Sequence, residues 1–445
     1  MITKTCFLAV ASVLLISSSQ GDDAIPTDPQ PRWWKGNIHT HSLWSDGNDF
    51  PEMIAEWYRT HDYNFLALSD HNVLSQGKRF VTVAKIRDRV GNEAVEKYRR
   101  RFGTDWVETQ GEPGDDDFAV RLKPLNEFRA LVEQRGRFIL IQAEEISDRA
   151  EGATLHMNAT NVADLIEPQG GSTIREAIQN NLRAAQEQAS EAGQESLVHL
   201  NHPNFNWGVT AEDIAAVVQE RFFECYNAHP GVRHHGDADH PGVERMWDIV
   251  NTIRTDQLGA PPIFGVATDD SHHYHGKHGG SHPGRGWIMV RSKYLTPEYL
   301  IAAINAGDFY ASSGVQLADI QHEDGQLRVV VDPHHSADKD VTYTFEFIGT
   351  RHDYDSESQP RDVENPDRVT RKYSSTIGET FQRSEGTEAT YTLDGSELYV
   401  RCVITSSEDH HDPSFEDQKQ QAWIQPIVPA SSPRIEPEPE PEPEH

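Results

Sequence analysis

The chain has 445 residues, of which 40 are basic and 71 acidic, giving a formal charge of −31. This length allows two or three domains with a full hydrophobic core, and the charge excludes nucleic-acid coating and polybasic membrane attachment, which need a cationic surface. Three cysteines exclude a disulfide scaffold and a thiolate zinc cluster, whereas 23 histidines leave imidazole and carboxylate as the ligands for any metal ion.

The two ends of the chain differ in composition from the rest. Residues 1–21 combine one lysine, an apolar run over 6–16 and a small-residue end, the pattern of a cleaved secretory signal peptide, and the run is too short to span a bilayer. Residues 429–445 repeat Glu and Pro, which favours a disordered, solvated tail. We therefore expect a secreted or periplasmic protein without a membrane span.

Between residues 33 and 314, short apolar runs alternate with amphipathic stretches. This alternation predicts an α/β fold with a parallel sheet or an α/β barrel. The charged, helix-prone segment 77–133 interrupts the pattern, and we interpret it as a helical insertion. The predicted strands are 65–69, 138–142, 196–200, 222–226, 262–267 and 287–291, and the predicted helices are 51–60, 173–192, 243–257 and 296–306.

After residue 314 the pattern changes to β-branched and aromatic residues of alternating polarity, as in 327–331 and 398–404. Such a pattern predicts a small antiparallel, β-sandwich-like domain over 315–428. Once the leader is removed, Cys225 and Cys402 are the remaining cysteines, and they form either one disulfide or two buried thiols.

Histidines and carboxylates gather just after the predicted strands of the first region. His39 and His41 are two residues apart, as are Asp270 and His272, so in extended chain each pair points to one side. The carboxyl ends of strands in an α/β barrel converge on one mouth. The pattern thus predicts a metal site there, to which Asp46, His71, Glu144, Glu145, His156, His199, His202 and Asp269 are further candidates.

Five motifs, at 36–47, 66–72, 145–147, 202–203 and 270–272, occur in the order found in the PHP (polymerase and histidinol phosphatase) superfamily, which the sequence resembles over about residues 33–314. The resemblance implies a distorted (β/α)7 TIM-like barrel with a trinuclear metal site. It also implies hydrolysis of phosphate esters, although a minority of the superfamily acts on other bonds.

Carried onto this sequence, the resemblance implies three divalent ions. The nitrogen and oxygen ligands suit Zn, Mn or Fe best. Two choices of ligand remain open: either Glu144 or Glu145, and either Asp269 or Asp270. The two-residue spacing to His272 favours Asp270. The ligands would be His39, His41, Glu145 and Asp270 for the first ion, Glu145, His156 and His202 for the second, and Asp46, His71 and His272 for the third.

Clustered divalent ions generate hydroxide near neutral pH and clamp phosphoryl oxygens. The sequence therefore predicts an exported metal-dependent phosphoesterase that acts on a small anionic substrate. Two alternatives remain: the same site cleaves a carbamate, ester or amide, or the chain is a non-catalytic module that binds a surface or polysaccharide through 315–428. The predicted catalytic residues are Glu145, Asp270, His199 and His229, and the predicted substrate-binding residues are Arg285 and Lys277, in a Gly- and His-rich loop.

Overall fold

The computed structural model describes residues 28–91, 93–275, 280–335 and 340–429. The predicted leader, residues 430–445 of the predicted Glu-Pro tail and Lys277 lie outside these ranges. Within them, no helix has the length and apolar character needed to cross a membrane. The described chain is a mixed α/β protein, as the sequence predicted.

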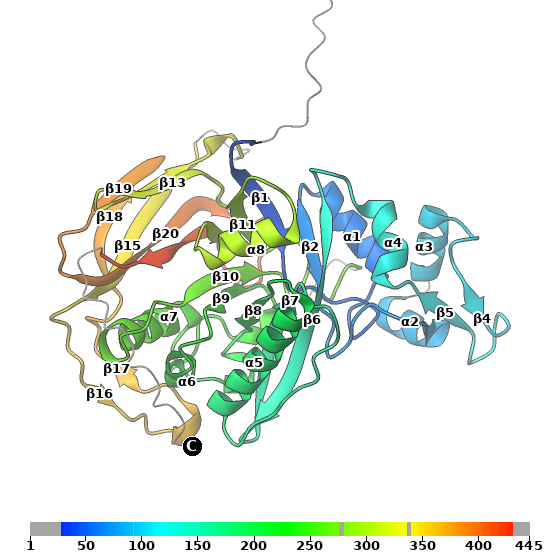
Figure 1. The fold of residues 1–445 in the computed structure, drawn as a ribbon, viewed down its shortest axis with the longest axis horizontal. Coiled ribbons are helices and arrows are strands. Elements are labelled where there is room, and N and C mark those ends of the chain that lie inside the picture. The colour runs from blue at the N-terminus through cyan, green and yellow to red at the C-terminus, as the bar shows by residue number, and fades with distance from the viewer. Residues whose placement is uncertain (1–27, 92, 276–279, 336–339, 430–445) are drawn as a thin grey trace, which may run out of the picture. The chain divides into compact units, whose positions relative to one another are not determined.

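A thirteen-stranded sheet organises the fold (Figure 1). Its strands, in spatial order, are β10 (Phe264–Thr268), β9 (Phe222–Asn227), β8 (Leu197–Leu200), β7 (Ala153–Thr160), β6 (Ile139–Ala150), β2 (Phe65–Leu68), β1 (Arg32–Asn37), β11 (Trp287–Ser292), β12 (Phe309–Ser312), β21 (Lys419–Ile427), β20 (Glu397–Asp409), β15 (Tyr343–Arg351) and β18 (Glu379–Glu385).

The first half of this sheet is largely parallel. Strands β1, β2 and β6 are parallel neighbours, as are β8, β9 and β10, and β7 is antiparallel to both β6 and β8. Side chains from strands far apart in the sheet order, including Phe65, Ile141 and Val266, belong to one buried cluster with Leu300. The sheet therefore curls around a common interior, and the carboxyl ends of its parallel strands face one region.

The predicted (β/α)7 TIM-like barrel does not close in the structure. Among the described residues, β10 has β9 as its hydrogen-bonded neighbour and does not pair with β11 or β12. Strand β12 instead pairs with β21, in the register Tyr310 to Ile424. That pairing occupies the edge of β12 and continues the sheet into the C-terminal strands, so the curl stays open.

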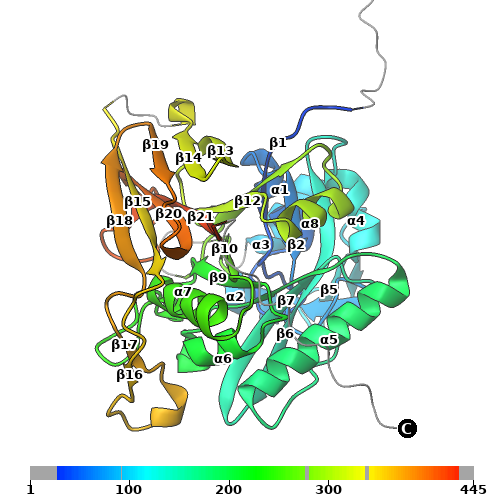
Figure 2. The same cartoon turned by 60° about the vertical axis from the view of Figure 1, so that its left-hand side comes forward.

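Helices cover the outer face of the parallel strands, with α5 along β6 and β7 (Figures 1 and 2). Thr173 caps α5 by accepting a hydrogen bond from the Glu176 N–H, and Gly193 ends it in the left-handed conformation. The helices are α1 (Pro51–Thr60), α5 (Ile174–Ala192), α6 (Ala211–Ala216), α7 (Val243–Thr252) and α8 (Pro297–Asn305), with short turns η1 (Phe205–Trp207), η2 (Pro230–Val232) and η3 (Ile253–Gln257).

The predicted insertion contains helices and also a small sheet that the sequence reading missed. Its polar contact with α1 is buried: the Glu52 carboxylate accepts hydrogen bonds from the Tyr98 hydroxyl at 2.5 Å and the Trp106 indole at 3.0 Å. The elements are β3 (Arg79–Thr82), α2 (Val83–Val90), α3 (Ala94–Phe102), β4 (Thr109–Gln110), β5 (Ala119–Leu122) and α4 (Leu125–Val132).

Burial raises the pKa of Glu52 from 4.5 to about 7, although its hydrogen bonds oppose the shift. The folded state thus holds a proton that the unfolded chain has lost, and stability contributed by this group is lost as pH rises from 4.5 to about 7. We expect the free energy of unfolding to fall over this interval by up to about 3 kcal/mol relative to Glu52→Gln, measured by urea denaturation. Parallel pH profiles for the two proteins would contradict this account.

The C-terminal strands continue the large sheet and add a smaller one over it (Figure 2). Trp423 of β21 is fully buried and stacks on Tyr226 of β9 at 5.3 Å between ring centroids. Cys225 and Cys402 are buried free thiols. The remaining elements are β13 (Leu317–Glu323), β14 (Gln326–Val331) and β19 (Glu388–Thr392), the pair β16 (Ser358–Gln359) and β17 (Lys372–Tyr373), and the turns η4 (Pro333–His335) and η5 (Pro366–Arg368).

Candidate metal centre

The motif residues meet because the segments that leave the parallel strands pair with each other. Thr40, between His39 and His41, forms a parallel bridge with Ser271, and His71 forms one with Glu145. His39 and His41 follow β1, and His71 follows β2, as the sequence predicted, whereas Glu145 lies within the long strand β6. All nine predicted ligands come together in one cluster, which consists of His39, His41, Asp46, His71, Glu145, His156, His202, Asp270 and His272.

The residues assigned to the first ion form a tight group of four. The Nε2 atoms of His39 and His41 are 3.1 Å apart. His39 Nε2 lies 3.4 Å from Glu145 Oε2 and 3.3 Å from Asp270 Oδ1, and His41 Nε2 lies 3.2 and 3.3 Å from the same two oxygens. Ligand atoms about 2.0 Å from a tetrahedral ion are about 3.3 Å from one another, so these spacings fit such an ion.

Glu145 connects this group to the second one because its two oxygens face different imidazoles. Oε2 faces His39, His41 and, at 2.8 Å, His71 Nδ1, whereas Oε1 lies 2.9 Å from His156 Nδ1 and 3.5 Å from His202 Nε2. Glu145 is fully buried, and its Oε2 makes no well-aligned hydrogen bond among the described residues, although His71 Nδ1 lies 2.8 Å away. A buried carboxylate oxygen in this state costs free energy that a cation would offset.

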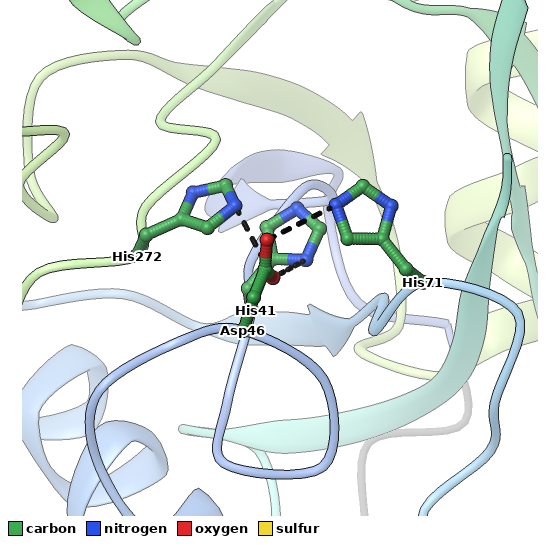
Figure 3. A group of neighbouring side chains, drawn as sticks. All are labelled: His41, Asp46, His71 and His272. Atoms are coloured by element: carbon green, nitrogen blue, oxygen red, sulfur yellow. Dashed lines mark ion pairs between the residues drawn. The ribbon is translucent and has the colours of Figure 1, made fainter. Parts of the chain in front are cut away.

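The third group surrounds the Asp46 carboxylate, which lies among three imidazole rings (Figure 3). Asp46 Oδ1 is 3.4 Å from His272 Nε2, and Oδ2 is 3.6 Å from His71 Nε2. His41 turns its second nitrogen, Nδ1, towards Oδ1 at 3.6 Å. The structure therefore adds His41 to this group and makes it a link between the first and third groups.

The charges of the cluster suit metal ions. Burial alone would raise the pKa values of Glu145 and Asp270, but the surrounding imidazoles hold both well below their ordinary values, so both side chains are anionic. Burial lowers the pKa of His156, which favours the neutral ring with a free lone pair. At His39, His71, His202 and His272 burial acts in the same direction, but the neighbouring carboxylates outweigh it and raise the pKa, so a bound ion would displace protons from these rings. Anionic carboxylates and neutral imidazoles are the ligands that divalent zinc, manganese and iron prefer.

The two choices left open in the sequence have clear positions. Glu144 points away from the cluster, where its Oε1 accepts the Ile166 N–H at 2.7 Å, and burial raises its pKa to about 8. Asp269 accepts the N–H groups of Gly284, Arg285 and Gly286. Glu145 and Asp270 are therefore the carboxylates that face the imidazoles.

Glu224, which the sequence reading did not single out, lies directly behind the cluster. Its Oε1 accepts from His39 Nδ1–H at 2.6 Å and from the Thr268 hydroxyl, and its Oε2 accepts from the His202 N–H at 2.7 Å and from Asn227. The bond to Nδ1 leaves the lone pair of His39 on Nε2, the atom that faces Glu145 and Asp270. The sequence does contain a signal for Glu224, because it is a charged residue inside the otherwise apolar run 222–226.

Two other polar residues shape the cluster without belonging to it. Asp70 accepts from the backbone N–H and the hydroxyl of both Ser42 and Ser45, and so fixes the turn that carries Asp46. The buried Ser281 hydroxyl donates to the Asp270 carbonyl at 2.6 Å. Such contacts fix the orientation of ligand side chains.

A cavity of about 330 Å³ opens over the cluster and is lined by ligands of all three groups. His229, His273, Phe205 and Val232 complete its wall. His229 Nδ1 accepts the Gly231 N–H at 3.0 Å, and His273 Nδ1 accepts the Ser281 N–H at 3.2 Å. In the neutral ring each therefore carries its proton on Nε2, and both rings can donate a hydrogen bond to a bound molecule.

Two predicted site residues have other positions. His199 is fully buried beside Glu224, 3.6 Å from its Oε1, and is not part of the cavity wall, so contact with a substrate is excluded in this conformation. Arg285 is 4% exposed, and its guanidinium bonds to Asp412 and to the Gly280 carbonyl. The roles of His199 in catalysis and of Arg285 in substrate binding stay predictions. Both positions depend on partners that are distant in sequence.

No protein-family model matches the sequence, and no curated protein matches it either. Among solved structures, the chain is similar to a two-domain protein from Bacteroides vulgatus that contains a predicted PHP-like metal-dependent phosphoesterase, with 13% identity, a TM-score of 0.37 and coverage of 90% of this chain and 97% of that one. It is also similar to a putative metal-dependent phosphoesterase from Bifidobacterium adolescentis, with 14% identity, a TM-score of 0.28 and coverage of 57% and 93%.

Proposed function

We propose that the chain is a metal-dependent phosphoesterase whose nine clustered ligands hold three divalent ions. The observation that carries the proposal is the position of Glu145, which presents one oxygen to His39 and His41 and the other to His156 and His202. A buried carboxylate between two sets of imidazoles is the arrangement expected of a bridging ligand. The third group, around Asp46, shares His41 with the first.

Bound divalent ions would supply an activated water molecule and would offset negative charge on the phosphoryl oxygens. Among the described residues that line the cavity there is no lysine or arginine, so within this part of the chain the ions would supply the charge compensation. His229 and His273 would orient the substrate by donating hydrogen bonds from Nε2. Phe205 and Val232 give one side of the cavity an apolar wall suited to the carbon skeleton of the alcohol that leaves.

The test is hydrolysis after metal loading. Protein stripped with a chelator and then loaded with Mn²⁺ or Zn²⁺ is expected to release p-nitrophenol from p-nitrophenyl phosphate or from bis(p-nitrophenyl) phosphate, and the stripped protein is not. The His39→Ala/His41→Ala double variant serves as the control, because both rings belong to the first group. Aryl carbamates and carboxylic esters assayed alongside would reveal the alternative bond specificity.

The outcome that would contradict the proposal is a loaded, folded protein that hydrolyses no phosphomonoester or phosphodiester. Turnover that persists in the double variant would contradict it equally, because that activity would not come from the cluster. Export is part of the same proposal and rests on residues 1–21. Its check is the N-terminal sequence of the protein recovered from a secreting host, which is expected to begin near residue 22.

A further inference from the structure

A loop far from the ligand motifs in sequence contacts the two segments that carry the cavity histidines. Residues 410–418 connect β20 to β21 in the C-terminal strands. Their partners lie at 226–228, just before His229, and at 282–285, just after the motif that contains Asp270 and His272. The loop thus joins the C-terminal strands to both sides of the candidate site.

The first contact is an ionic one centred on Asp412. Its Oδ1 accepts a hydrogen bond from an Arg285 Nη at 2.8 Å, and its Oδ2 lies 2.9 Å from His282 Nδ1. A second guanidinium nitrogen of Arg285 donates to the Gly280 carbonyl at 2.9 Å. The Arg285 side chain is 5% exposed and the Asp412 side chain 36%, so the ion pair is sheltered from water on the arginine side and reaches solvent on the aspartate side.

The segment that Asp412 holds is bonded directly to the ligands through Ser281. The Ser281 hydroxyl donates to the Asp270 carbonyl at 2.6 Å and accepts from the His272 N–H at 3.0 Å. The Ser281 N–H donates to His273 Nδ1 at 3.2 Å. A displacement of this segment would therefore move two ligands and one hydrogen-bond donor of the cavity together.

The second contact reaches the other histidine. The Ser414 hydroxyl donates to the Ala228 carbonyl at 2.7 Å, immediately before His229, and Gln418 Nε2 donates to the Tyr226 hydroxyl at 2.7 Å. Gln418 Oε1 accepts the Ser414 N–H at 2.7 Å, which fixes these two loop residues relative to each other. His229 and His273 are thus positioned from the same loop.

We propose that the loop 410–418 positions the catalytic loops of the site, with Asp412 as the main positioning residue. The C-terminal strands then hold the site in shape through this loop. Positioning errors of about 1 Å commonly cost on the order of 100-fold in rate, and loss of a residue that supports metal ligands commonly costs about 10–100-fold. Because its turnover readout rests on the proposed function, the test also needs a readout independent of turnover.

The experiment compares wild type, Asp412→Ala, Asp412→Glu and the control Asp409→Ala, which removes an exposed ion pair with Lys419 at the base of the same loop. Asp412→Ala is expected to lower kcat on p-nitrophenyl phosphate about 10-fold or more, with metal content unchanged, because every ligand remains. The visible absorption of the Co²⁺-loaded protein is expected to change in Asp412→Ala and to return towards wild type in Asp412→Glu. The control is expected to match wild type in all three measurements.

The proposal is overturned by wild-type kcat and an unchanged Co²⁺ spectrum in Asp412→Ala, or by a loss of activity that only follows a loss of bound metal. If Asp412→Ala does not fold, Ser414→Ala decides: a fall in kcat of about threefold or more supports the proposal, and an unchanged kcat overturns it. If wild type hydrolyses no ester, the proposed function fails, but the Co²⁺ spectra still decide whether Asp412 positions the ligands.

Discussion

Glu145→Gln is expected to abolish binding of at least two metal ions and to lower kcat/KM by about 100-fold or more. The substitution keeps the size of the side chain but removes the charge, and the amide nitrogen would face either the first group or the second as a donor where an acceptor is needed. Loss of an outer support of a ligand already costs about 10–100-fold, and Glu145 contacts the imidazoles of two groups directly. Elemental analysis and hydrolysis rates on the same preparation measure both effects.

The neighbouring residue provides a matched control. Glu144→Gln makes the same chemical change one position earlier in β6, where burial already raises the pKa to about 8 and keeps the carboxyl largely protonated at pH 7. Glutamine can still accept the Ile166 N–H through its carbonyl oxygen. We therefore expect unchanged metal content and rate in Glu144→Gln, and a reversal of the two phenotypes would show that the wrong carboxylate has been assigned.

Glu224→Gln is expected to weaken metal binding by about 10–100-fold, the usual cost of losing a carboxylate that orients a ligand histidine. Each oxygen of Glu224 accepts two hydrogen bonds, so in the glutamine variant one pair of donors would face an amide nitrogen. Either His39 would then lose the partner that fixes its tautomer, or the backbone N–H of His202 would lose its acceptor. Competition with a chelator of known affinity measures the effect.

Glu220→Gln is the control for this variant. Glu220 is also buried, near the start of the same strand, but its carboxylate accepts the Phe222 N–H and lies near Arg254 instead of the cluster. Metal affinity is expected to stay at the wild-type value. Equal affinities in Glu224→Gln and wild type would show that Glu224 does not orient the ligand.

Sequence reasoning identified the strands of the parallel region and the order of the ligand motifs because both depend on local patterns. Apolar runs such as 222–226 became strands, and His39 with His41 met on one side as their spacing requires. Glu145 and Glu144 point in opposite directions because neighbouring side chains alternate along a strand. These features could be predicted because each depends on a few residues that lie close together along the chain.

The rest depended on contacts between distant segments. Closure of the barrel was decided by β21, which pairs with β12 from more than a hundred residues away. Arg285 has the charge of a substrate-binding residue, but its buried guanidinium is paired with Asp412, from a loop more than a hundred residues away in sequence. The same holds for Glu224, whose role appears only when β9 lies beside the segment that follows β1. No local pattern carries such information.

The most direct test of the central claim is elemental analysis of wild type and Glu145→Gln, purified side by side and dialysed against metal-free buffer after loading with Mn²⁺ or Zn²⁺. The bridging position of Glu145 predicts about three tightly bound ions per wild-type chain and at most one in the variant. A wild-type chain without bound metal, or a variant that retains the full complement, would contradict the claim.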